Sequence, residues 1–251
     1  MDRKINYHIQ TLPDIIDKGR IPTFDDKGVL LECIPYSSEL VYNPTMIASF
    51  VIRTKSEPNI QWLLDNMEKD GTVRHNYQSA FSPPPGWIGG LSQSLVGSAL
   101  IQSGHEEEGK RAIDSLVKNC YKNGVIYERP NQIILNGWMY GIFGMYDAGK
   151  SIYEPITKLA DSLRLFDGKY WSYYSNEWIF APTFYHNIHI QQLNALYEHS
   201  DHEVLLYFYN HWKDDSNKRK ALLHRNLQLL KKHKLQLYSQ WRKRKKWQKN
   251  L

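Results

Sequence analysis

Apolar residues recur three and four positions apart from Asn43 onward, which predicts a succession of amphipathic helices. Asn43 followed by Pro44 is a suitable helix start, because asparagine caps helix N-termini and proline fits the first turn. Leu135, Trp138 and Ile142 belong to the clearest stripe. The stripes run over 43–51, 60–67, 91–100, 112–120, 135–146, 156–163, 185–198 and 205–212.

Short extended, aromatic stretches separate the predicted helices, at 77–81, 125–130 and 169–185. The last contains Ser175-Asn176-Glu177, which predicts a short hairpin. Because the helices pair along the chain and no βαβ alternation occurs, we predict a mainly α protein: an α/α toroid, or incomplete α/α barrel, of antiparallel helix pairs with short β-hairpins at a central cleft.

The chain divides into three parts by pattern and charge. Residues 1–42 have turn signals and little periodicity, so we expect an irregular lead-in. Residues 43–215 carry the helical pattern and form the predicted toroid domain. Residues 216–251 carry 13 lysines and arginines and no acidic residue, which leaves 19 basic against 26 acidic residues in 1–215. The net charge of +6 therefore belongs to the tail.

Composition indicates a soluble globular protein, with 41% hydrophobic and 23% charged residues. No apolar run is long enough to cross a bilayer, and the first residues do not resemble a signal peptide. Two cysteines make neither a disulfide framework nor a zinc site. We therefore expect a cytoplasmic protein. The basic tail favours contact with an anionic surface at the inner face of the membrane. A solvated extension and a contact with an acidic glycan stay open as alternatives. A nucleic-acid partner is not expected.

The densest polar cluster lies in Tyr185-His186-Asn187-Ile188-His189-Ile190-Gln191-Gln192. On a helix Tyr185, His189 and Gln192 share one face, where they could supply a proton-transfer group with an orienting neighbour or could simply be core residues. The two histidines lack further ligands, so no metal site is expected.

Three other positions draw attention. Glu128 and Arg129 lie just before a predicted helix. They are either functional side chains carried by a loop or an ion pair exposed to solvent. Asn136 lies in a strongly apolar helix next to Gly137, which indicates close packing or ligand approach. Trp87 opens another helix near Gln93 and is either a sugar-stacking platform or a core residue.

Several of these segments together resemble the C-terminal domain of heparan/heparosan D-glucuronyl C5-epimerases. They are Gly86-Trp87 with Gln93 downstream, Leu135-Asn136-Gly137-Trp138-Met139-Tyr140-Gly141-Ile142-Phe143-Gly144-Met145-Tyr146-Asp147, Trp171-Ser172-Tyr173-Tyr174, and Tyr185-His186-Asn187-Ile188-His189-Ile190-Gln191-Gln192-Leu193. The resemblance covers about Asn43 to Trp212. It implies an α/α toroid and reversible inversion at C5 of a hexuronate within a polysaccharide, D-glucuronate to L-iduronate.

The resemblance also implies site residues. Tyr185 falls on the tyrosine of the Tyr-His motif and is expected to be catalytic. Tyr127 and Glu128 fall near a Glu-Tyr pair of the family, here in reversed order, and are expected to share that role. Tyr173 or Tyr174 would be a further cleft tyrosine. Substrate-positioning roles are expected for Trp87, Gln93, Arg129, Asn136, His186 and His189, with no cofactor and no metal.

The family's animal members carry β-rich domains ahead of the toroid that contribute to dimerisation, whereas about 40 residues stand there in this chain. A homodimer stays open. The expected partner is an anionic, uronate-containing polysaccharide. The alternatives are a uronate polysaccharide lyase, which shares the C5 proton abstraction, a hydrolase, for which Glu128 is the one clear carboxylate, and a non-catalytic glycan-binding protein on the same fold.

Overall fold

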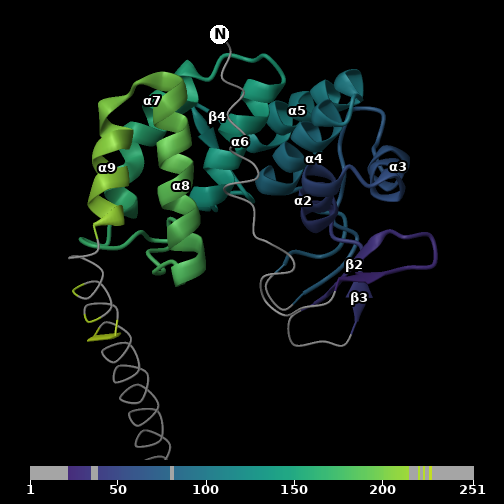
Figure 1. Ribbon diagram of the computed structural model, residues 1–251, viewed down its shortest axis with the longest axis horizontal. Helices are drawn as coiled ribbons and strands as arrows, with labels where there is room; N and C mark the ends of the chain where they lie inside the picture. The colour runs from purple at the N-terminus through teal and green to yellow at the C-terminus, as the bar shows by residue number, and fades with distance from the viewer. Residues whose placement is uncertain are drawn as a thin grey trace, which may run out of the picture.

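The computed structural model describes residues 22–34, 39–79, 82–214 and the single positions 220, 223, 226 and 227. This part of the chain is mainly helical, with small antiparallel sheets (Figure 1). The greater part of the tail at 216–251, and with it the predicted membrane contact, lies outside the described residues.

Helices occur where the apolar stripes predict them. Asn43 caps α2, since its side-chain oxygen accepts a hydrogen bond from the Thr45 N–H at 3.0 Å, and Pro44 occupies the first turn. The helix that carries most of the 60–67 stripe begins after Ser56 and ends at Asp65. The helices are α2 (Pro44–Thr54), α3 (Glu57–Asp65), α4 (Gly90–Gln102), α5 (Glu106–Cys120), α6 (Leu135–Asp147), α7 (Tyr153–Ser162), the 3-10 helix η1 (Leu163–Phe166), α8 (Thr183–Ser200) and α9 (Glu203–Lys213).

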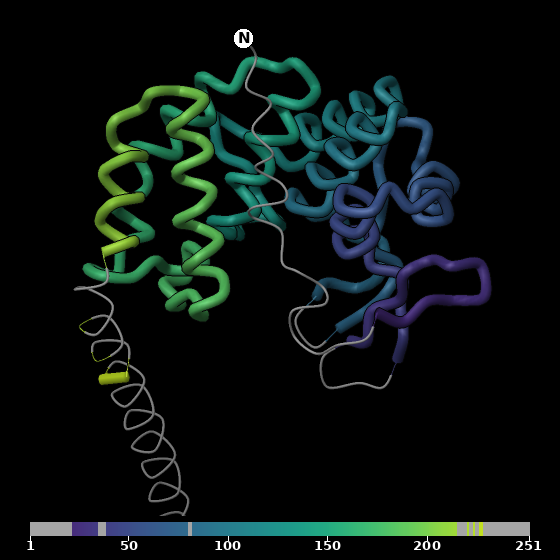
Figure 2. Tube along the Cα trace, in the orientation of Figure 1, coloured from purple at the N-terminus to yellow at the C-terminus, as the bar shows by residue number. Residues whose placement is uncertain are grey.

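Four of the helices pack side by side in one row, and other helices pack against it. In this row α2 packs on α4, α4 on α6 and α6 on α8, while α3, α5, α7 and α9 each pack against a member of that row. Figure 2 shows the chain passing from the N-terminal strands, α2 and α3 at one end to α7, α8 and α9 at the other. This alternation is that of successive antiparallel helix pairs.

Glycines allow the helices to approach closely. A Cβ on Gly97 of α4 would lie 2.4 Å from the Ile113 side chain of α5, and one on Gly109 of α5 would lie 2.7 Å from the Gly97 carbonyl oxygen. These distances are shorter than van der Waals contact, so the α4–α5 pair requires glycine at both positions. Large buried side chains such as Trp138 and Phe143 of α6 fill the adjoining core.

The expectation of an irregular lead-in is wrong for residues 23–24, 30–33 and 40–41, which form strands. Strands β1 (Thr23–Phe24), β2 (Leu30–Cys33) and β3 (Leu40–Val41) form a three-stranded antiparallel sheet in the order β1-β2-β3. Buried Asn59 of α3 joins the sheet to the helices, because its Oδ1 accepts a hydrogen bond from the Leu30 N–H at 2.9 Å. Strands this short have no clear alternation to read in a sequence.

Two further extended segments lie between helices. Strands β4 (Tyr121–Lys122) and β5 (Val125–Ile126) form an antiparallel hairpin. The hairpin predicted around Ser175 is confirmed as an antiparallel bridge between Tyr173 and Phe180, closed by a Trp178 N–H to Ser175 O hydrogen bond of 3.1 Å. Both segments lead into the site described below.

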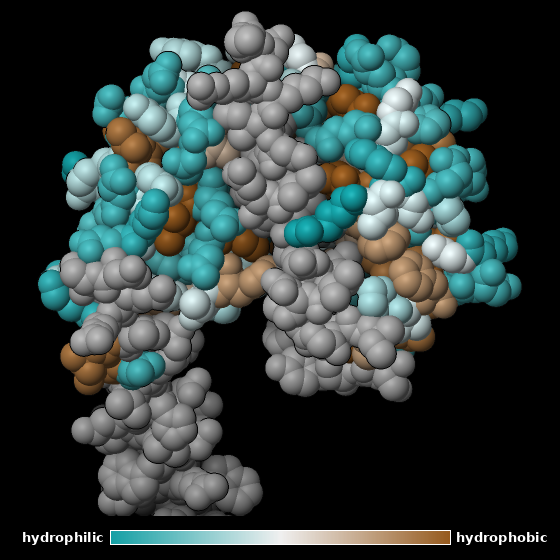
Figure 3. Space-filling model, viewed as in Figure 1, coloured by the Kyte–Doolittle hydropathy of each residue, from teal (hydrophilic) through white to brown (hydrophobic). Residues whose placement is uncertain are grey.

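Hydrophilic side chains cover much of the visible face, with apolar residues between them (Figure 3). Within the described ranges, the helices are too short or too polar to span a bilayer.

Candidate functional site

Glu128 follows β5 and places a carboxylate against the N-terminus of α4. Its Oε2 accepts a hydrogen bond from the Leu91 N–H at 2.8 Å, and the residue is buried, with 8% of its surface exposed. The first N–H groups of a helix have no partner within the helix and carry partial positive charge. The helix end therefore holds the carboxylate in one orientation.

The glycine pair before Leu91 makes room for Glu128. A Cβ on Gly89 would lie 2.7 Å from the Oε1 atom of Glu128, and one on Gly90 would lie 2.4 Å from the carbonyl oxygen of Tyr127. Any larger residue would push the Glu128 segment away from α4. This pair is therefore a sequence feature that specifies the position of the carboxylate.

Burial changes the acidity of Glu128. Loss of hydration raises the pKa of its carboxyl from 4.5 to about 7, against the smaller lowering effects of the Leu91 hydrogen bond and of Arg129. A carboxyl group with a pKa near neutrality exists in both protonation states at pH 7. It can therefore accept or release a proton under ordinary conditions.

Arg129, Trp87 and His75 form a stack beside Glu128. The Arg129 guanidinium carbon lies 4.9 Å from the centre of the Trp87 ring. The His75 ring stacks on Trp87, with ring centroids 3.8 Å apart. Burial, together with the smaller effect of the Arg129 charge, lowers the pKa of His75 to about 3. The permanent positive charge at this place is therefore that of Arg129, close to the Glu128 carboxylate.

Tyr174 and Tyr185 form a second pair, with ring centroids 4.8 Å apart. Burial raises the pKa of both phenols, and the hydrogen bond between them raises that of Tyr174 and lowers that of Tyr185. The charge of Glu128 raises, and that of Arg129 lowers, the pKa of Tyr174. The tyrosine pair and the Glu128–Arg129 pair therefore belong to one electrostatically coupled site.

Sequence reasoning missed two members of this site, Tyr77 and Glu32. Burial raises the pKa of Tyr77, and the charges of Glu32 and Glu128 raise it further. Glu32 of β2 also raises the pKa of Tyr185 and accepts a hydrogen bond from the Asn43 side chain. Nothing in the local sequence marks these residues, because the fold brings them from two N-terminal segments to Glu128.

Two predicted tyrosines have other surroundings. Tyr127 packs against the hydrophobic core. Tyr173 contacts Phe180, with ring centroids 4.7 Å apart, and its pKa is raised by burial and, to a smaller extent, by the charge of Asp167. Since successive residues of an extended segment point to opposite sides, Tyr174 rather than Tyr173 joins Tyr185.

The substrate-binding prediction for Gln93 requires correction. Its side chain is fully buried, its amide nitrogen donates to the Gly71 and Ala112 carbonyl oxygens at 2.6 and 3.2 Å, and its amide oxygen accepts from the Val73 N–H at 3.1 Å. With these groups bonded inside the protein, Gln93 ties the loop before α4 to α5. Its role is structural.

His186 and His189 also lie in the interior, where Ser172 joins them. The Ser172 hydroxyl lies 2.8 Å from His186 Nδ1 and 2.7 Å from His189 Nδ1, and the His186 ring stacks on Trp171 at 3.8 Å. Burial lowers the pKa of His189 well below its usual value. Both histidines are at most 2% exposed, so the prediction that they contact substrate is corrected to a packing role.

Asn136 lies in the first turn of α6. It is 2% exposed, and its carbonyl oxygen accepts a hydrogen bond from the Gln192 side chain at 3.2 Å. Its side-chain oxygen has no hydrogen-bond partner among the described residues. A cluster of three or more His, Cys, Asp or Glu side chains suited to a metal ion does not occur in the described part of the chain.

A family comparison accounts for this arrangement of motifs. Residues 104–214 match the family model described as the D-glucuronyl C5-epimerase C-terminus. This segment is therefore similar to the C-terminal domain of the D-glucuronyl C5-epimerases. No curated protein matches the chain.

The segment that matches the C5-epimerase family model, called the C5-epimerase segment below, contains only part of the site. Glu128, Arg129, Tyr174 and Tyr185 lie inside the matched residues, on the β5–α6 connection, the 173–180 hairpin and α8. Their partners Glu32, Tyr77 and Leu91 come before residue 104, where the matched segment begins. The site is thus assembled from the C5-epimerase segment and the N-terminal strands and loops of this chain.

Proposed function

We propose that the protein is a polysaccharide hexuronate C5-epimerase that converts D-glucuronate to L-iduronate residues within a polymer. The observation that carries the proposal is the coupled site of Glu128, Arg129, Tyr174 and Tyr185, in which Glu128 has a pKa of about 7. The match of residues 104–214 to the D-glucuronyl C5-epimerase C-terminus supports the same reaction class. The row formed by α2, α4, α6 and α8 is proposed to be the inner wall of an incomplete α/α toroid.

Inversion at C5 requires a base and an acid on opposite faces of the sugar ring. The C5–H bond breaks, its electron pair is delocalised into the adjacent carboxylate, and a proton returns to C5 from the other face. In the proposal Glu128 accepts the first proton, since its pKa leaves it ionised in part at neutral pH. Tyr185, whose phenol is protonated because burial raises its pKa, supplies the second.

The charge that develops on the substrate carboxylate needs compensation. Arg129 is suited to this because its guanidinium is always protonated and lies over the Trp87 ring at 4.9 Å, at the edge of the site. Tyr174 positions Tyr185 through their shared hydrogen bond. The proposed reaction is a proton exchange that needs no net oxidation or reduction.

Deuterium incorporation tests the proposal. The purified chain is incubated with heparosan in deuterated water and the product is examined by proton NMR. Deuterium at C5 together with iduronate signals, both lost in Glu128→Gln and in Tyr185→Phe, is the expected result. Wild-type protein that leaves the C5 proton in place on heparosan would contradict epimerisation of this polymer.

A uronate lyase shares the abstraction of the C5 proton and therefore remains the second candidate. It differs in expelling the substituent at C4, which creates a conjugated double bond. The same reactions are followed by ultraviolet absorbance. Absorbance that rises in step with C5 proton loss identifies a lyase, and its absence in a reaction that incorporates deuterium identifies the epimerase.

A further inference from the structure

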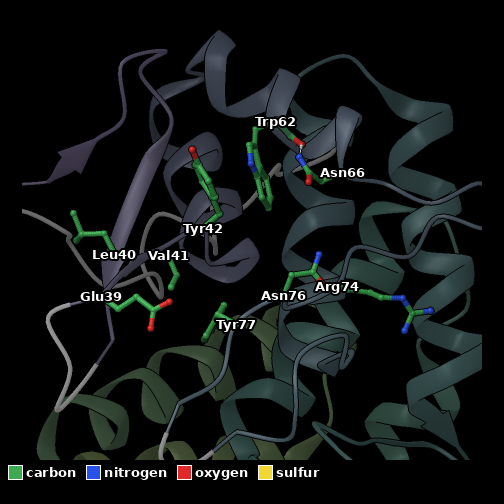
Figure 4. Close-up of a pocket in the computed structure, with 9 residues that line it drawn as sticks. All are labelled: Glu39, Leu40, Val41, Tyr42, Trp62, Asn66, Arg74, Asn76 and Tyr77. Carbon is green, nitrogen blue, oxygen red and sulfur yellow. Dashed lines mark hydrogen bonds between the residues drawn. The ribbon is translucent and has the colours of Figure 1, made fainter.

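A pocket of about 240 Å³ lies next to the site, between β3, α3 and the segment before α4. Figure 4 shows Tyr42 and Trp62 side by side along one side of it, with Tyr77 and Asn76 across from them. The volume is below the roughly 300–1,000 Å³ of sites that enclose drug-sized ligands. The pocket therefore suits a group about as large as one sugar ring.

The walls of the pocket combine an aromatic surface with polar side chains. The Tyr42 and Trp62 rings are stacked with centroids 5.5 Å apart, and Asn66, Asn76 and Glu39 contribute amide and carboxylate groups. Aromatic rings present an apolar face, and amides and carboxylates bond hydroxyl groups. A sugar ring has this same combination of apolar C–H face and hydroxyl edge.

The charges at the pocket disfavour an anionic ligand. Arg74 lines the pocket, but in Figure 4 its guanidinium points away from the centre, and it binds Glu68 with an Nε–Oε1 distance of 2.6 Å and the Gly86 carbonyl oxygen at 2.9 Å. Glu39, the other charged residue that lines the pocket, supplies no positive charge. Since the Arg74 guanidinium is already paired, the described lining residues offer no unpaired cation to a carboxylate, and a neutral sugar fits better than a uronate.

Tyr77 connects this pocket to the site. Its side chain lines the pocket, and its hydroxyl group lies 3.3 Å from Nδ1 of His75, whose ring stacks on Trp87 of the site at 3.8 Å. A polymer whose uronate lies at Glu128 therefore continues past Tyr77 into the pocket. We propose that the pocket formed by Tyr42, Trp62, Asn76 and Tyr77 is a subsite for a neutral sugar residue of the uronate polymer, an inference that rests on the proposed function.

Affinity for a heparosan decasaccharide tests the subsite, measured by calorimetric titration of wild-type protein and variants at several salt concentrations. Trp62→Leu keeps an apolar side chain against the core and is expected to raise the dissociation constant about tenfold. Asn76→Ala changes an exposed side chain, so the variant is expected to fold like wild type. A rise of the dissociation constant of about threefold is expected. Tyr153→Ala, at an exposed tyrosine of α7, is the control and should bind like wild type.

The salt dependence identifies the charge of the bound sugar. Loss of a neutral contact lowers affinity equally at all salt concentrations, whereas loss of an ionic contact matters less as salt screens it. Parallel salt curves for wild type and Trp62→Leu are expected, and a flatter curve for Trp62→Leu would overturn the neutral assignment. Pocket variants that bind like wild type would overturn the subsite.

Failure of the subsite and failure of the epimerase proposal give different results. If wild-type protein incorporates deuterium at C5 while Trp62→Leu binds normally, the reaction stands and the subsite is wrong. If binding depends on Trp62 but no C5 proton exchanges, the subsite stands as part of a glycan-binding site and the reaction is wrong.

Discussion

The Leu91 N–H donates a hydrogen bond of 2.8 Å to Oε2 of Glu128, which fixes the carboxylate at the N-terminus of α4. The same carboxyl group is buried and has a raised pKa of about 7. The hydrogen bond sets its direction and burial sets its acidity. A group that is both oriented and half ionised at neutral pH has the properties of a general base.

Replacement of Glu128 by glutamine should abolish most proton exchange. Glutamine has a similar shape and its side-chain oxygen can still accept the Leu91 hydrogen bond, but it cannot take up a proton. We expect the rate of deuterium incorporation at C5 to fall about a hundredfold or more. Circular dichroism should show unchanged helix content, and a variant that exchanges at the wild-type rate would remove Glu128 from the proposed mechanism.

The same substitution should alter the pH dependence of stability. The folded-state pKa of Glu128 is raised from 4.5 to about 7, so its contribution to stability is complete below pH 4.5 and is lost as the pH rises through 7. The loss amounts to about 3 kcal/mol at alkaline pH. Relative to wild type, Glu128→Gln should therefore gain unfolding free energy between pH 4.5 and 8, as measured by urea denaturation.

Tyr185→Phe removes a hydroxyl group from the site while the ring that packs beside Tyr174 remains. We expect loss of C5 exchange by about a hundredfold, since the returning proton has lost its donor. Tyr174→Phe should reduce the rate less, because Tyr174 acts through Tyr185. Tyr173→Phe is the matched control at the neighbouring residue, and an equal loss there would contradict the assignment of Tyr174 and Tyr185.

Most of the helical structure could be predicted from the sequence, because each helix buries one apolar stripe. The strands at 23–41 could not, since Leu30 is held by Asn59 of α3, far along the chain. Gln93 shows a related limit for the site. A buried amide that bonds the main chain and an amide that bonds a substrate look the same in a sequence.

Glu128, Arg129 and Tyr185 could be found from motifs because they occur in or beside recognisable segments. The choice between Tyr173 and Tyr174 needed the alternation of the hairpin, which decides the side on which each ring lies. Tyr77 and Glu32 needed the whole fold, since their electrostatic coupling to the site joins distant segments.

Acid should destabilise the protein through His75. Burial lowers its pKa from 6.5 to about 3, so the folded state keeps the ring neutral while the unfolded chain takes up a proton. The stability that this provides is complete above pH 6.5 and falls with pH, by about 2 kcal/mol at pH 5. Relative to wild type, His75→Phe, which keeps a ring against Trp87, should gain unfolding free energy as the pH falls from 7.5 to 5. A difference between variant and wild type that stays constant over this range would show that His75 does not contribute to the pH dependence.

Replacement by alanine should change the free energy of unfolding in opposite directions at two glycines, Gly137 and Gly109. A Cβ on Gly137 of α6 would meet its nearest neighbour, the Leu91 Cβ, at 3.5 Å, an ordinary contact, so Gly137→Ala should stabilise the protein by about 0.5–1 kcal/mol through helix propensity. A Cβ on Gly109 would lie 2.7 Å from the Gly97 carbonyl oxygen and 2.9 Å from the Ile101 nitrogen, which are main-chain atoms that cannot rotate away. Gly109→Ala should therefore force α4 and α5 apart and cost about 1–3 kcal/mol. Thermal and urea unfolding of both variants at one pH provides the comparison, and a stabilised Gly109→Ala would show that the two helices do not pack as closely as described.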